Sequence, residues 1–241
     1  VEASFDALRN MDVGLDLGSL RFVVRVTDEE DWANNWKVYY KPFPIGERLL
    51  VRPSWEAVVN AEDRVVLSLD PGMAFGTGSH HTTRMCLEYL EKTVQGGDRI
   101  LDLGCGSGIL SIAGVLLGAQ SALAVDIDPI AEKIAYENAQ LNGVQRDRYT
   151  VRIGDVLTDH ALRRFLGTQQ YDIVMANIVA SVILALLPIV PPLLRAGGTF
   201  ITSGIIRERL DEVKDAILAN GLAVEDVQIQ EEWCAILARK G

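Results

Sequence analysis

From about residue 97 onward, short apolar runs alternate with amphipathic stretches along the chain. The first apolar runs fall at 99–103, 121–125 and 149–153, and stretches with helical periodicity lie between them at 107–117 and 129–142. Further strand-like runs follow at 171–176, 198–203, 223–229 and 233–238. Parallel strands need helical crossovers, so this alternation predicts an α/β fold with a mostly parallel sheet covered by helices on both faces.

The last two runs, 223–229 and 233–238, have no helical stretch between them. So short a connection joins antiparallel strands, because parallel neighbours require a crossover of about a dozen residues or more. We therefore expect the sheet to end in an antiparallel hairpin at its edge. A wholly parallel dinucleotide-binding sheet lacks this ending.

The N-terminal part of the chain has a different pattern. The run Leu20–Val26 is rich in β-branched and aromatic residues, which is typical of a strand. A capping box at Thr27–Glu30 then predicts the start of a helix, which Pro42 and Pro44 end. We divide the chain into a partial N-terminal β-rich element, a linker helix and the main α/β domain, at 1–27, 28–45 and 46–241.

A glycine-rich turn follows the first strand of the main domain. Gly104, Gly106 and Gly108 form the spacing G-x-G-x-G, whereas a pyrophosphate-binding loop has G-x-G-x-x-G. The first two glycines remove side chains that would keep a ligand off the backbone, and the third lets the next helix approach the strand. Asp102 places a carboxylate where phosphates would be repelled and a sulfonium cation would be attracted. The loop therefore favours S-adenosylmethionine, which we place against Gly104 and Gly106.

Carboxylates stand at the ends of the next two strands. Asp126 can accept hydrogen bonds from both hydroxyls of a ribose, a role shared by NAD and S-adenosylmethionine sites. Asp155 can accept from an adenine amino group, or it can be a solvated loop residue. Asp128, followed by Pro129, suits the N-cap and first turn of a helix. We assign Asp126 and Asp155 to the cofactor.

Asn177 ends the fourth strand, directly after an apolar run. A buried amide without partners costs about 1–3 kcal/mol, so a buried Asn177 needs hydrogen bonds. It could serve as a plain helix cap. As a catalytic residue at the strand end, its carbonyl oxygen would hold an acceptor amine near the methyl group of the cofactor.

The net charge of the chain bears on whether its partner is a nucleic acid or a protein. The formal charge of −10 repels phosphates, which argues against a large nucleic-acid interface and suits a basic protein partner. The three cysteines contain no C-x-x-C pair, so we expect free thiols in a reducing compartment. Together with the three histidines they form no metal-ligand spacing, and we expect no metal.

Nothing in the sequence predicts a membrane span or a secretion signal. The most apolar stretch, Ile178–Leu194, contains prolines near its end and is typical of a fold interior. The first residues lack a basic region followed by an apolar core. We therefore expect a cytoplasmic protein.

Several motifs together resemble one family, the ribosomal protein L-eleven methyltransferases (PrmA family). They are P-G-M-A-F-G-T-G-S-H-H-T-T at 71–83, L-D-L-G-C-G-S-G-I-L at 101–110, D-I-D-P at 126–129 and A-N-I at 176–178. The first is far more specific than the glycine loop, which indicates only a class I methyltransferase. The resemblance runs from about Glu29 to Lys240.

The resemblance implies a Rossmann-like class I methyltransferase sheet and S-adenosylmethionine as cofactor. It implies cofactor contacts at Thr83, Gly104, Asp126 and Asn177. It also implies methylation of lysine and N-terminal amines of ribosomal protein L-eleven. The family has a longer N-terminal substrate-recognition domain than residues 1–27 can form. Many amino-group methyltransferases also carry an aromatic residue three positions after the asparagine, where this chain has Ala180.

Other functions remain as alternatives. A nucleotide-linked dehydrogenase would need the other glycine spacing and a second catalytic domain. A nucleic-acid or small-molecule methyltransferase would keep the chemistry and change the substrate. A non-catalytic cofactor-binding scaffold would keep the loop and lose turnover.

Overall fold

The computed structural model describes residues 40–57, 61, 63–70 and 78–241 of the chain. The N-terminal element predicted at 1–27 lies outside the described residues, as does most of the linker helix. From Lys41 onward the chain forms one compact unit.

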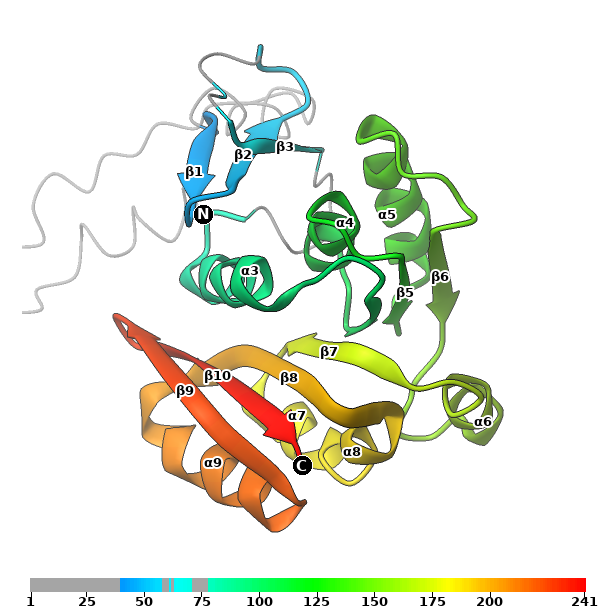
Figure 1. Cartoon of the computed structure of the whole chain (residues 1–241), viewed down its shortest axis with the longest axis vertical. Coiled ribbons are helices and arrows are strands. Elements are labelled where there is room, and N and C mark those ends of the chain that lie inside the picture. The colour runs from blue at the N-terminus through cyan, green and yellow to red at the C-terminus, as the bar shows by residue number, and fades with distance from the viewer. Residues whose placement is uncertain (1–39, 58–60, 62, 71–77) are drawn as a thin grey trace, which may run out of the picture. The chain divides into compact units, whose positions relative to one another are not determined.

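A seven-stranded sheet is the centre of this unit (Figure 1). Its strands, in spatial order, are β6 (Tyr149–Ile153), β5 (Ser121–Asp126), β4 (Arg99–Leu103), β7 (Tyr171–Asn177), β8 (Leu194–Ile206), β10 (Trp233–Lys240) and β9 (Leu222–Gln230). The first five are mutually parallel, and β10 is antiparallel to both of its neighbours. The predicted mostly parallel sheet with an antiparallel C-terminal hairpin is confirmed. The hairpin's second strand, β10, lies inside the sheet, and β9 forms the edge.

Helices cover both faces of this sheet (Figure 1). On one face lie α3 (His81–Thr93), α4 (Ile109–Leu116) and α5 (Pro129–Leu141); α6 (His160–Leu166), α7 (Ala180–Leu186), α8 (Val190–Leu193) and α9 (Leu210–Ala219) pack with the other. Side chains alternate along the strands, so that Ile100 lies in the core of one face and Leu101 in the core of the other. Asp128 caps α5 by accepting from the Ile130 amide at 3.0 Å, as its position before Pro129 predicts.

A second, three-stranded sheet was not predicted. It consists of β1 (Phe43–Ile45), β2 (Leu49–Pro53) and β3 (Val65–Leu69), with β1 antiparallel and β3 parallel to β2. The assignment of 28–45 to a linker helix is therefore wrong at residues 43–45. Pro44 lacks an amide hydrogen and fits the edge strand of this sheet, where one side of the backbone needs no partner.

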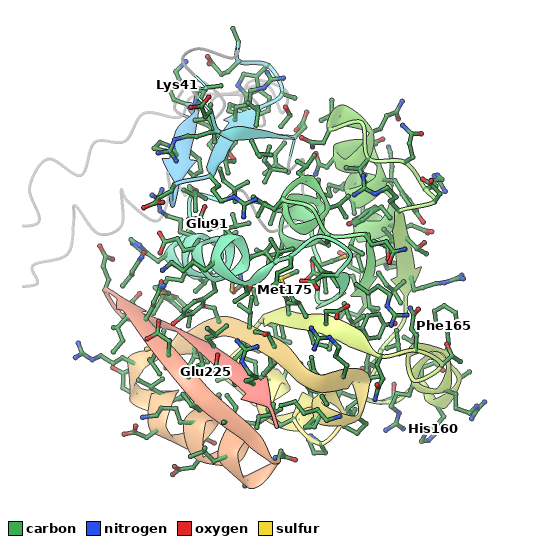
Figure 2. The ribbon with its side chains drawn as sticks, viewed as in Figure 1. Lys41, Glu91, His160, Phe165, Met175 and Glu225 are labelled. Atoms are coloured by element: carbon green, nitrogen blue, oxygen red, sulfur yellow. The ribbon has the colours of Figure 1, made fainter. Side chains whose placement is uncertain are left out.

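Glu91 of α3 holds the turn between β1 and β2 (Figure 2). Its two carboxylate oxygens accept from the amides of Glu47 and Arg48 at 2.9 and 3.0 Å. Gly46 begins this turn with φ +53°, and a Cβ there would lie 1.8 Å from Glu91 Oε1. The turn therefore requires glycine at position 46.

Two asparagines of α5 and its C-terminal end bind β3. Asn142 accepts from the Ser68 amide at 2.8 Å and donates to the Ser68 carbonyl at 2.7 Å, as a neighbouring strand would. Asn138 accepts from the Asp70 amide at 2.8 Å. The small sheet also contributes apolar side chains, such as Leu67, to the core shared with α3 and α4. These contacts make the small sheet part of the main domain.

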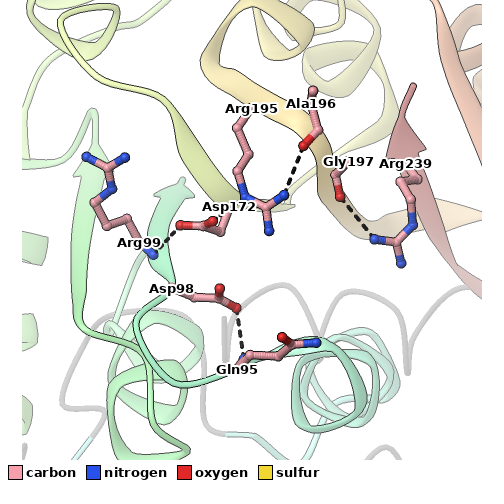
Figure 3. Close-up of polar contacts among 8 residues, drawn as sticks. All are labelled: Gln95, Asp98, Arg99, Asp172, Arg195, Ala196, Gly197 and Arg239. Atoms are coloured by element: carbon pink, nitrogen blue, oxygen red, sulfur yellow. Dashed lines mark hydrogen bonds and ion pairs between the residues drawn. The ribbon is translucent and has the colours of Figure 1, made fainter.

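Polar contacts connect the amino-terminal ends of the central strands (Figure 3). Asp172 of β7 accepts from the Arg99 amide of β4 at 2.7 Å and pairs with the guanidinium of Arg195 of β8. Burial alone would raise the pKa of Asp172, but these bonds hold it below its usual value. The opposite, carboxyl-terminal ends of the strands are left for a ligand site.

Among the helices that the structure describes, none combines the length and apolar composition that crossing a membrane requires.

Candidate functional site

A cleft of about 700 Å³ opens at the carboxyl-terminal ends of the parallel strands. Open α/β sheets bind their ligands at this place. Its lining comes from the ends of β4, β5 and β7, from the loop after β6, and from α3, β8 and β10. All six residues predicted for the site line it together: Thr83, Gly104, Gly106, Asp126, Asp155 and Asn177.

The glycine loop forms the floor between β4 and α4. The amides of Gly104 and Cys105 both donate to the Val125 carbonyl, at 2.8 and 3.1 Å. Gly104, Gly106 and Gly108 have φ values of 79°, 51° and 79°, which other residues rarely adopt. The glycine spacing identified in the sequence is thus a conformational requirement of the loop.

Asp126 lies at the end of β5 with its carboxylate facing the loop. One oxygen accepts from the Gly106 amide at 2.8 Å and the other from the Asp128 amide at 3.0 Å. A carboxylate has about four lone-pair positions, so both oxygens can still accept from a pair of hydroxyls. This arrangement fits the ribose role predicted for Asp126.

Asp155 also lines the cleft, but its side chain closes the turn after β6. It accepts from the Leu157 amide at 2.8 Å and from the Thr158 hydroxyl at 2.9 Å. The structure therefore gives Asp155 a local structural role. Its contact with an adenine amino group stays a prediction.

Asn177 and Thr83 meet across the cleft, although 94 positions separate them in the chain. The Asn177 side-chain Nδ2 donates to Thr83 Oγ1 at 3.2 Å. Thr83 is fully buried on α3, so this contact fixes the rotamer of a half-buried amide. Within the described part of the chain, no group donates to Asn177 Oδ1. The carbonyl oxygen is therefore available to an acceptor molecule.

The sequence predicted the Asp102 carboxylate beside the ligand, but Asp102 does not line the cleft. It is 1% exposed beneath the loop, and one oxygen accepts from the Ser111 amide at 3.2 Å. The other has no hydrogen-bond partner among the described residues. Burial raises the pKa of Asp102 to about 7, the Ser111 bonds oppose that shift, and the nearby Asp126 adds to it.

Several lining residues were not predicted from the sequence. Ile127 and Val179 are 73% and 61% exposed at the mouth of the cleft, which is unusual for such side chains. Trp233, at the start of β10, packs edge-to-face on the His80 imidazole with ring centroids 5.0 Å apart. Gly204 has φ +87°, and a Cβ there would lie 2.2 Å from the Ile178 carbonyl oxygen. The available signal was an apolar residue within two positions of a polar strand end, Ile127 after Asp126 and Val179 after Asn177.

Potential metal ligands are dispersed in the described part of the chain. In the described ranges, no three histidine, cysteine or acidic side chains lie close enough together to hold an ion. The expectation that the site needs no metal stays a prediction.

Comparison with known proteins identifies the family. The model of one family, "Ribosomal protein L11 methyltransferase (PrmA)", matches residues 2–241. The chain belongs to this family. A ribosomal protein L11 methyltransferase of Caldanaerobacter subterraneus subsp. tengcongensis is 44% identical over 227 residues, which cover 94% of this chain and 70% of that relative.

Solved structures agree with this family. The ribosomal protein L11 methylase of Lactobacillus delbrueckii subsp. bulgaricus aligns with a TM-score of 0.75 and 31% identity, covering 84% of this chain and 100% of that one. SMU.776, a putative methyltransferase complexed with SAH (S-adenosylhomocysteine), aligns with a TM-score of 0.58 over 67% of this chain and 50% of that one. At 14% identity, this second likeness shows the fold alone.

Family membership confirms the Rossmann-like methyltransferase fold and S-adenosylmethionine as cofactor. The cleft fits that cofactor. The Asp126 oxygens are placed where they can accept from ribose hydroxyls, and Gly104 and Gly106 allow close approach to the backbone. Ile127, Val156 and Leu157 offer apolar surface near Asp155.

Proposed function

We propose that this chain transfers methyl groups from S-adenosylmethionine to lysine side-chain amines and the α-amine of ribosomal protein L11. The observation that carries the proposal is the Asn177 amide, anchored by Thr83 beside the glycine loop and Asp126. The family supports the choice of substrate.

When bound, S-adenosylmethionine supplies an electrophilic methyl group on a sulfonium sulfur. That methyl group would be taken up by the lone pair of the acceptor nitrogen, with the C–S electron pair left on sulfur and one N–H proton released to water. Asp126 holds the ribose, and Asn177 Oδ1 accepts from an N–H of the amine. The main contribution of the protein is thus to position the two reactants in line.

The acceptor amine must be neutral. A free lysine has a pKa of about 10.4, so roughly one molecule in a thousand is deprotonated at pH 7. Ile178, Val179 and Trp233 make this part of the cleft apolar, and desolvation lowers the pKa of an amine. Many amino-group methyltransferases have an aromatic residue at the position of Ala180, and in this chain Trp233 supplies an aromatic ring to the cleft instead. We assign no strong base, and His80 is the alternative proton acceptor.

The same proposal assigns different roles to the regions of the chain. Residues 46–241 bind the cofactor and carry out the transfer, and residues 1–27 with the linker contribute to docking of the substrate. The charge of −10 favours a basic protein partner over nucleic acid. We place the reaction in the cytoplasm, because the described cysteines are free and buried.

Calorimetric titration with S-adenosylhomocysteine and, separately, with NAD tests the cofactor site. We expect micromolar affinity for the first alone. Binding of NAD alone would refute the assignment of the loop. Transfer of labelled methyl groups to purified L11 then tests the substrate.

Replacement of Asn177 by alanine tests its orienting role. We expect kcat to fall on the order of 100-fold, because the acceptor loses its alignment, while the Kd of S-adenosylhomocysteine stays within about threefold. Asn220→Ala, at the C-cap of α9, is the matched control and should leave both values unchanged. Normal turnover of Asn177→Ala with weakened cofactor affinity would show that Asn177 only binds the cofactor.

A further inference from the structure

Asn138 is a fully buried amide on α5 that does not line the cleft. Its Oδ1 accepts from the Asp70 amide at 2.8 Å, at the end of β3. Its Nδ2 donates to the Ser107 carbonyl at 2.9 Å. One side chain therefore joins the small sheet to the glycine loop.

Ser107 stands between Gly106 and Gly108, in the middle of the loop that faces the cofactor. A loop with three left-handed glycines has many accessible conformations, so its external anchors determine which one it adopts. β5 provides one set of anchors, through the Val125 carbonyl and the Asp126 carboxylate. Asn138 provides another from a helix outside the cleft.

We infer that Asn138 is a positioning residue, which holds the glycine loop in its cofactor-binding conformation and couples it to β3. This inference rests on the proposed cofactor site. A loop held in its bound conformation loses little entropy when the ligand arrives, and a loop without its anchor loses more. Asn138 therefore raises cofactor affinity without touching the cofactor.

The coupling between Asn138 and cofactor binding is reciprocal. If the position of Asn138 affects cofactor affinity, bound cofactor must stabilise the position of Asn138 to the same extent. The end of β3 is then protected by a ligand that lies on the other side of the loop. The Ser68 amide, which donates to Asn142 Oδ1, reports on this effect.

Asn142 offers a matched control. It lies one turn further along and hydrogen-bonds Ser68 and the Asn138 backbone carbonyl. Among the described residues, its side chain makes no hydrogen bond to the glycine loop. Asn138→Leu and Asn142→Leu each remove an amide that binds β3, so we expect both to lower the thermal midpoint. Only Asn138→Leu should raise the Kd of S-adenosylhomocysteine, by about tenfold.

Hydrogen exchange provides the second readout. S-adenosylhomocysteine should slow exchange of the Ser68 amide in the unmodified chain but not in Asn138→Leu. In Asn142→Leu, where Ser68 has lost its acceptor, it should still slow exchange of the Asp70 amide, which donates to Asn138. Should Asn138→Leu fail to fold, Asn138→Ala removes the same two hydrogen bonds without placing a branched apolar side chain in the buried site. It should show the same loss of affinity.

The outcomes separate the two hypotheses. Unchanged affinity in the foldable Asn138 variant, or an equal loss in Asn142→Leu, overturns the positioning role while the cofactor site stands. Failure of the unmodified chain to bind S-adenosylhomocysteine overturns the proposed function itself.

Discussion

Asp102 and Asp126 stand at the ends of neighbouring strands but differ in their surroundings. Asp126 is half-buried, faces the cleft and accepts one backbone amide on each oxygen. Asp102 is almost fully buried, and only one of its oxygens has a partner among the described residues. Asp126 is therefore the carboxylate that we propose binds the ligand, whereas Asp102 affects the stability of the fold.

Burial of Asp102 makes stability depend on pH. Its pKa of about 7 in the folded chain lies above the value of about 3.9 expected when unfolded. Between these values the folded state binds more protons than the unfolded state, so stability falls as pH rises from about 4 to about 7. We expect a loss on the order of a few kcal/mol, measured by urea unfolding at intervals across this range.

Asp102→Asn is the control for this pH dependence. Its amide oxygen can still accept from Ser111, and it carries no titrating group. Between about pH 4 and 7, the free energy of unfolding of Asp102→Asn should fall less than that of the unmodified chain. An identical pH profile in the variant would assign the effect to other groups.

At the scale of elements, the β1–β2 turn depends on a glycine and a carboxylate together. Gly46→Ala should destabilise the chain by about 3 kcal/mol, because it combines left-handed strain with displacement of Glu91. Gly143, with φ +67°, is closer to Gly46 in conformation and has nothing within 4 Å of a Cβ, so Gly143→Ala should cost only the strain. Urea unfolding compares the two. Equal losses would show that Glu91 moves aside freely.

The C-terminal hairpin is attached to the helix that carries Thr83. His81 of α3 contacts the Gln230 and Glu231 side chains, at 3.2 and 3.4 Å, in the turn between β9 and β10. Trp233 packs on His80. The hairpin therefore supports the side of the cleft at which the acceptor amine is proposed to enter.

The strands of the large sheet were predictable because each is apolar and is bounded by turn residues. The three strands of the small sheet could not be predicted in this way. β1 contains a proline, and residues 54–64 separate β2 from its parallel partner β3. The side chains that hydrogen-bond these strands and their turn, Glu91, Asn138 and Asn142, lie far away in the sequence.

At the scale of the molecule, the pattern of the sequence predicted the part of the site at strand ends, and Thr83 was predicted only from the family resemblance. Asp126 and Asn177 directly follow apolar runs, so sequence order alone located them at one edge of the sheet. Trp233 and Gly204 belong to strands whose position in the sheet depends on the insertion of β10. The Asn177–Thr83 contact likewise depends on how α3 packs across the sheet, which local patterns do not specify.

The net charge of −10 predicts how substrate binding responds to salt. Acceptor lysines are cations in solution, so an acidic protein attracts them over a distance that salt shortens. The KM for L11 should rise several-fold between about 0.05 and 0.5 M NaCl. Affinity for S-adenosylhomocysteine, measured in the same buffers, should change little. A KM independent of salt would show that recognition relies on apolar contacts.

The position of β10 also affects the order in which the chain can fold. A ribosome makes β9 before β10, yet β10 separates β9 from β8 in the finished sheet. Until β10 has emerged, β9 has no strand to pair with, and the unpaired edge of β8 is open to other chains. A protein proposed to modify a ribosomal component thus completes its own sheet only after the residues up to Lys240 have left the ribosome.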